Sequence, residues 1–133
     1  MLETTISPAS ERSTIKVGPT FTGDVFLELI HHDAKVATAH ATFTPCARTN
    51  WHTHEEGQVL KVTTGSGWIC DKGAKPRRIK AGDVIWAPAG TTQWHGADEG
   101  TLMTHFVVGL GETKWLEPVS DEEYRTGRDA SAA

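Results

Sequence analysis

The sequence contains no long hydrophobic run, no basic stripe and almost no helical periodicity, and each absence excludes a class of protein. No apolar stretch approaches the roughly 18 residues that a membrane-spanning helix requires. Residues 1–13 are rich in hydroxyl side chains and lack the apolar run of a signal peptide. The net charge of -4 argues against nucleic acid or an anionic membrane surface as a partner. We therefore expect a cytoplasmic protein that binds neither membranes nor nucleic acids.

Cysteine is also scarce, because Cys46 and Cys70 are the two cysteines of the sequence and they lie far apart. Nothing in their spacing demands a disulfide, and a reduced compartment is the default for such a chain. The 133 residues, 38% of them apolar and 23% charged, suffice for one globular domain with a single core.

Short runs rich in Val, Ile, Thr, Phe and Trp alternate with turn signals that contain Gly or Pro. The runs cover residues 24–31, 36–43, 58–64, 83–86 and 102–108, and the turn signals include Gly65-Ser66-Gly67. This pattern predicts an all-β sandwich or barrel. Near the end, Ser120 and Glu123 form a capping-box pattern, which predicts a short helix over residues 121–125.

His52 and His54 are separated by one residue, and on a β-strand such side chains project from the same face. Two inward imidazoles are poor filler for an apolar core unless something binds them. Gln58 follows on the next strand and brings an amide oxygen to the two nitrogens. These groups form most of the shell of a first-row metal ion. We therefore predict that His52, His54 and Gln58 bind one divalent metal ion.

A second group of polar residues follows a tight Pro/Gly turn. Gln93 and His95 share a strand face for the same reason of parity. The turn chemistry that follows indicates a hairpin centred near Glu99. That register would place His95 opposite Met103 and Gln93 opposite His105, so that all four line one wall.

These two groups resemble the two motifs of the cupin superfamily, whose members are small β-barrels built as double-sheet jelly rolls. The first family motif is G-x5-H-x-H-x3or4-E-x6-G, and the second is G-x5-P-x-G-x2-H-x3-N. The matching residues are His52, His54 and Gly65 in the first motif and Gly82, Pro88 and Gly90 in the second. The chain departs from the family at Gln58, where Glu is usual, and at Gln93, where the last metal-binding His is expected.

More narrowly, the segments A-R-T-N-W-H-T-H, Q-W-H-G and M-T-H-F resemble the small bacterial cupins that include manganese-dependent hydroxynitrile lyases. The similarity extends through the pattern W-x-E-x-V-[ST]-D-E-x-Y over residues 115–124. It implies that His95 and His105 are pocket histidines outside the metal shell, and that the protein is a homodimer or a higher homo-oligomer. We expect an N-terminal arm over residues 1–20, a cupin barrel over residues 21–118, and a short helix with a frayed tail over residues 119–133.

The two glutamines change the expected metal chemistry. Without the usual carboxylate, a divalent ion beside Gln58 keeps its full charge and acts as a stronger Lewis acid. Three outcomes are open at the second position: Gln93 coordinates through its oxygen, His95 takes its place, or the pocket works without a metal. We favour the first, a two-His, two-Gln site that suits manganese, with iron, zinc and nickel as alternatives.

These predictions together describe a metal-dependent cupin enzyme that acts on a small molecule by lyase or isomerase chemistry. His105 or His95 would remove or return a proton beside the metal. The candidates for the wall of the substrate pocket are His40, Trp94, Met103 and Arg48. The competing hypotheses are a metal-dependent dioxygenase, a tailoring enzyme of polyketide or other secondary metabolism, and a non-catalytic ligand-binding cupin.

Overall fold

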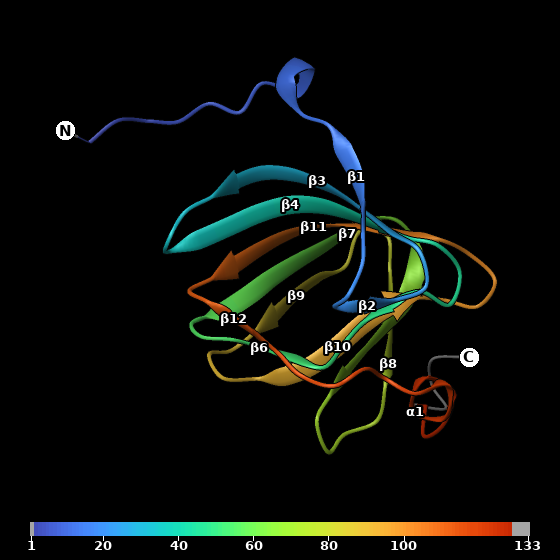
Figure 1. Cartoon of the computed structure of the whole chain (residues 1–133). Coiled ribbons are helices and arrows are strands. Elements are labelled where there is room, and N and C mark those ends of the chain that lie inside the picture. The colour runs from blue at the N-terminus through green and yellow to red at the C-terminus, as the bar shows by residue number, and fades with distance from the viewer. Residues whose placement is uncertain (1, 129–133) are drawn as a thin grey trace.

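The computed structural model describes residues 2–128 as two facing antiparallel sheets that curl into a nearly closed barrel (Figure 1). The first sheet contains β1 (Thr14–Val17), β3 (Val25–His32), β4 (Val36–Phe43), β11 (Met103–Leu110), β9 (Val84–Ala87) and the first half of β7 (Gly57–Asp71). The second contains β2 (Phe21–Thr22), β5 (Arg48–Thr49), β6 (His52–His54), β8 (Arg77–Lys80), β10 (Thr92–Ala97), β12 (Thr113–Trp115) and the second half of β7. A 3-10 turn (Ala9–Glu11) and α1 (Asp121–Arg125) complete the described chain. The prediction of an all-β barrel with a short C-terminal helix is confirmed.

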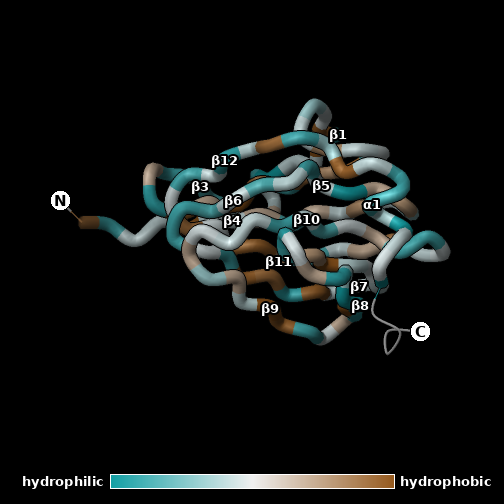
Figure 2. The backbone as a smooth tube through the Cα atoms, turned by 90° about the horizontal axis from the view of Figure 1, so that it is seen from below, coloured by the Kyte–Doolittle hydropathy of each residue, from teal (hydrophilic) through white to brown (hydrophobic). Residues whose placement is uncertain are grey.

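Alternation along each strand decides what faces the barrel interior. On β4, Ala39, Ala41 and Phe43 are buried, whereas His40 and Thr42 between them are partly exposed. Figure 2 shows hydrophobic and hydrophilic residues interspersed along the chain instead of gathered in long runs of one kind. The period of two therefore places one face of each strand in the interior.

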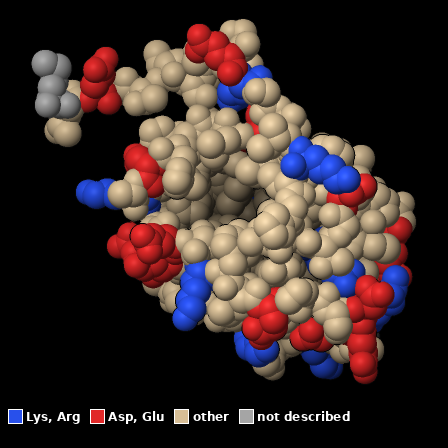
Figure 3. Space-filling view, viewed as in Figure 1, with Lys and Arg blue, Asp and Glu red and all other residues tan. Residues whose placement is uncertain are grey.

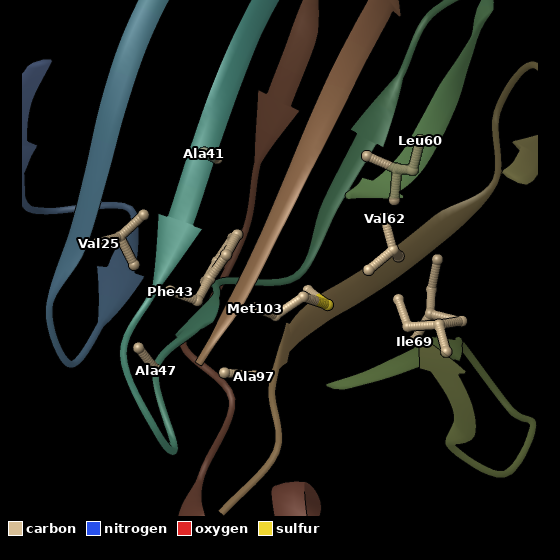
Figure 4. Close-up of a cluster of buried hydrophobic side chains, with 10 residues drawn as sticks. Val25, Ala41, Phe43, Ala47, Leu60, Val62, Ile69, Ala97 and Met103 are labelled. Atoms are coloured by element: carbon tan, nitrogen blue, oxygen red, sulfur yellow. The ribbon is translucent and has the colours of Figure 1, made fainter. Parts of the chain in front are cut away.

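The main hydrophobic core fills one end of the barrel. Phe43, Met103, Val62 and Ile69 are buried there and belong to strands of both sheets. Figure 4 shows these side chains converging between β4, β7 and β11. Side chains therefore fill this end of the barrel.

A second cluster lies on the outer side of the second sheet, under α1. Trp51, Trp68, Trp94 and Tyr124 pack together there, and Tyr124 donates its hydroxyl hydrogen to the Ala97 carbonyl. The helix begins at the predicted capping box, in which Ser120 and Glu123 each satisfy the backbone N–H of the other. The prediction of the helix and its cap is confirmed.

The sequence-based prediction of a turn at Gly65-Ser66-Gly67 is wrong, because β7 runs through these residues from one sheet into the other. The glycines are needed for close strand approach. A Cβ atom on Gly65 would lie 1.8 Å from the Leu102 carbonyl oxygen, and one on Gly67 would lie 2.0 Å from that of Gly96. The positive φ of 76° at Gly65 lets the strand change direction there without side-chain strain.

The predicted hairpin centred near Glu99 is also wrong. Strand β10 pairs with the second half of β7, whereas β11 pairs with β4 and with the first half of β7. His95 is therefore not paired with Met103, and Gln93 is not paired with His105. After β10 the chain crosses from the second sheet to the first. There β11 pairs with the first half of β7, whereas β10 pairs with the second half.

The predicted arm over residues 1–20 includes β1, which pairs with the edge of β3. Of the predicted frayed tail, residues 129–133 lie outside the described residues. Within residues 2–128, the one α-helix is too short to cross a membrane. Self-association and a cytoplasmic location stay predictions.

Candidate active site

A cavity of about 440 Å³ opens between the two sheets and borders the main core at Ala41 and Phe43. Figure 3 shows its mouth as a hollow whose rim is mostly uncharged. Ala37, Ala39 and Ala41 line one wall from β4, and their small side chains leave the space unfilled. The polar lining residues are Thr20, Thr49, His52, His54, Gln58, His95, His105 and Thr113.

His52 and His54 project into this cavity from β6. The Asn50 carbonyl oxygen lies 2.9 Å from His52 Nδ1, so Nδ1 carries the hydrogen and Nε2 keeps a free lone pair. His54 Nδ1 lies 3.0 Å from the Thr113 hydroxyl, and its Nε2 is buried without a hydrogen-bond partner. The two rings are 5.1 Å apart, centroid to centroid. Each ring is held through Nδ1 and leaves Nε2 for a ligand, as metal-binding histidines do.

The two glutamines add oxygen atoms to this group. Gln58 lines the cavity, and its Oε1 is buried without a hydrogen-bond partner. Gln93 is buried and lies directly across from His52 in the pairing of β10 with β6, although it does not line the cavity. Its Oε1 likewise has no hydrogen-bond partner. Buried polar atoms are normally paired, so these unpaired oxygens fit a missing ligand.

His95 and His105 meet inside the barrel from opposite sheets. His105 Nε2 lies 3.2 Å from His95 Nδ1, so the two imidazoles share one hydrogen. Phe43 packs against both rings, with centroid distances of 6.0 Å to His95 and 5.2 Å to His105. The His52 ring lies 5.0 Å from that of His95. The pair therefore lies next to the candidate metal ligands, and His95 Nε2, like His54 Nε2, is buried without a hydrogen-bond partner.

Burial keeps all four imidazoles neutral at pH 7. It lowers the pKa of His52, His54 and His105 to about 4, and the neighbouring His52 adds to the effect on His54. Burial is the main cause that lowers the pKa of His95 well below its usual value, and the nearby His105 adds to this effect. Neutral imidazole is the form that ligates a metal ion and the form that accepts a proton.

The cavity carries no formal charge at pH 7, because none of its lining residues is Asp, Glu, Lys or Arg. Within residues 2–128, no group of three or more His, Cys, Asp or Glu residues is placed to hold a metal ion. A metal shell at this site would therefore consist of the two imidazoles and glutamine oxygens. Such a shell leaves the charge of a divalent ion uncompensated.

The sequence analysis placed His40, Trp94, Met103 and Arg48 in the wall of the substrate pocket, but none of them lines this cavity. His40 lies on the outward face of β4, where its ring packs against Phe106. The Arg48 guanidinium lies outside the cavity and donates two hydrogen bonds to the Val119 carbonyl. These bonds hold the segment before α1 in place.

Trp94 and Met103 each belong to one of the two hydrophobic clusters instead. Trp94 has the opposite parity to His95, so it leaves the barrel interior and packs against Tyr124. Met103 does point inward, but it is part of the packed core at the closed end of the barrel. Both side chains are fully buried.

Sequence reasoning missed the alanines of β4 and an aromatic pair that lines the cavity. Phe21 and Trp115 line the cavity with their rings 5.7 Å apart, and Trp115 lies 4.9 Å from the His52 ring. The alanines at alternate positions were a visible signal for empty interior space. The position of Trp115 depends on the pairing of β12 with β6, for which the sequence holds no local signal.

Three comparisons bear on this site. No family model matches the chain. A curated relative, the (R)-mandelonitrile lyase of Granulicella tundricola, is 43% identical over 112 residues, which cover 79% of this chain and 86% of the relative. A solved structure of a cupin-like protein from Thermotoga maritima is 30% identical, with a TM-score of 0.78 over 98% of both chains. The polyketide cyclase RemF from Streptomyces resistomycificus shares the fold, with a TM-score of 0.69 over 93% of this chain and 91% of its own, at 17% identity.

A two-sheet barrel with an imidazole pair on one interior strand defines the protein class as a single-domain cupin. The chain belongs to the family of small cupins that resemble the hydroxynitrile lyases. The resemblance inferred from the motifs is confirmed.

Proposed function

We propose that the protein is a metal-dependent lyase that cleaves a small 2-hydroxynitrile with an aromatic substituent into an aldehyde and hydrogen cyanide. The central observation is the hydrogen-bonded His95–His105 pair, which lies beside two ligand-type imidazoles in an uncharged cavity. The name of the curated relative, a mandelonitrile lyase, supports this reaction and this substrate class.

The described residues fit a divalent ion. His52 and His54 would hold it through Nε2, and Gln58 and Gln93 through their unpaired oxygens. Two oxygen donors favour a hard ion, and we propose manganese. When bound, such an ion supplies a Lewis acid that stabilises negative charge on the substrate oxygen.

The histidine pair would move the proton of the reaction. One neutral imidazole of the His95–His105 pair accepts the hydroxyl proton of the substrate. The bond between the carbinol carbon and the nitrile carbon breaks, and its electron pair leaves with cyanide. Cyanide then takes the proton back from the pair and departs as hydrogen cyanide, which restores the neutral imidazoles.

The rest of the cavity would bind the substituent. The apolar wall includes Leu27, Val107 and the Phe21–Trp115 pair, which offers ring faces close to His52. A cavity of about 440 Å³ is of the size that encloses small ligands.

The experiment is mandelonitrile cleavage by chelator-treated protein before and after manganese is restored, with benzaldehyde and cyanide quantified. We expect activity to depend on the metal. In His105→Ala, kcat should fall about 100-fold or more at unchanged metal content, because a general base typically contributes that much. His40→Ala, which changes a histidine on the outer face of the same sheet, should keep wild-type kcat.

Unchanged turnover in His105→Ala would exclude His105 as the base. Equal activity with and without metal would exclude the metal-dependent reaction. Oxygen uptake with ferrous ion, in place of cyanide release, would support a dioxygenase instead.

A further inference from the structure

Gln93 lies between two polar partners on neighbouring strands. Its Cα pairs with that of His52 on β6 and with that of Asp71 on β7. Directly opposite residues of antiparallel strands present their side chains on the same face. Gln93 is 2% exposed, so water from the surface does not satisfy its polar atoms.

Asp71 determines which way the Gln93 amide faces. Gln93 Nε2 donates to Asp71 Oδ1 at 3.2 Å. A carboxylate only accepts hydrogen bonds, so the amide nitrogen must face Asp71 and the carbonyl oxygen must face away from it. That oxygen is buried and has no hydrogen-bond partner.

We propose that Asp71 is a positioning residue that holds the Gln93 carbonyl oxygen toward His52, so that the site offers two oxygens and two nitrogens to a divalent ion. The inference rests on the proposed metal dependence and adds a selectivity to it. Oxygen ligands suit manganese, whereas zinc and nickel gain more from nitrogen ligands. Asp71 thereby favours manganese without touching the ion.

The ion pair of Asp71 with Arg77 provides a matched control. Arg77 lies 3.6 Å from Asp71 Oδ2, and the two side chains are 64% and 40% exposed. Such exposed pairs contribute little to a fixed geometry. Removing Arg77 should leave the hydrogen bond between Asp71 and Gln93 intact.

The test is metal binding by chelator-stripped protein. Free manganese is followed by electron paramagnetic resonance, and zinc is then added as competitor. We expect Asp71→Ala to weaken manganese binding about tenfold or more, the usual effect of losing a group that orients a ligand. Asp71→Asn, which keeps an acceptor oxygen, and Arg77→Ala should stay within about threefold of wild type. Gln93→His should shift the preference from manganese toward zinc, since it replaces an oxygen donor by nitrogen.

The outcomes separate this inference from the proposed function. Wild-type protein that binds no divalent ion would overturn the metal site itself. Wild-type binding with Asp71→Ala indistinguishable from Arg77→Ala would overturn only the role of Asp71. Should Asp71→Ala fail to fold, Gln93→His decides the matter, because an unchanged preference between manganese and zinc would exclude Gln93 from the shell.

Discussion

Lowering the pH should destabilise the metal-free protein through its buried histidines. Burial holds the pKa of His52, His54 and His105 at about 4 in the folded protein. In the unfolded chain a histidine has a pKa of about 6.5. As the pH falls from about 6.5 to about 4, the unfolded chain binds protons that the folded protein cannot, so stability is lost in that window and kept above it.

The magnitude follows from the shift. With a pKa of about 4 when folded, each imidazole should lower the free energy of unfolding by about 2 kcal/mol between pH 7 and pH 5. The three together should remove about 6 kcal/mol, a large part of the stability of a small domain. Urea denaturation of chelator-treated protein at both pH values measures this loss.

A matched pair of variants assigns the loss to the cavity. His105→Phe keeps an aromatic ring without a titratable nitrogen and should abolish about 2 kcal/mol of the fall with pH. His32→Ala, at an exposed position, gives the background effect of removing a histidine. Equal free energies of unfolding at pH 7 and pH 5 in the wild type would refute the view that these imidazoles are buried and neutral.

Two further predictions concern close contacts and cavity volume. Gly67→Ala should destabilise the protein by about 3 kcal/mol, because its Cβ would lie 2.0 Å from the Gly96 carbonyl oxygen. Gly100→Ala, where no atom lies within 4 Å of such a Cβ, is the control, and equal melting temperatures would contradict the reasoning. Ala37→Leu should fill the cavity and abolish benzaldehyde binding, measured by calorimetry, while the outward Thr38→Leu on the same strand should retain it. Unchanged binding in Ala37→Leu would mean that the aldehyde binds elsewhere.

Features that depend on neighbouring residues could be predicted from the sequence. The helix over residues 121–125 follows from the local capping box, and the shared face of His52 and His54 follows from the period of two on a strand. The same period places Trp94 and His95 on opposite faces of one strand, so the outward position of Trp94 could also be predicted.

Features that depend on strand pairing could not be predicted. A glycine signals both a turn and a close approach of two strands, so Gly65 and Gly67 gave no sign that β7 continues between the sheets. His95 and His105 were expected to line one wall of a hairpin, but they meet across the barrel interior from strands that do not pair. The predicted register was wrong, and the contact between the two imidazoles was not predicted.

The central claim is that two imidazoles and a glutamine oxygen hold one metal ion beside a proton-transferring histidine pair. Anomalous diffraction at the manganese edge, from crystals of manganese-loaded protein, tests it most directly. The account predicts a single strong peak bounded by His52 Nε2, His54 Nε2 and Gln58 Oε1. A loaded protein whose peak lies elsewhere, or whose cavity contains none, would contradict it.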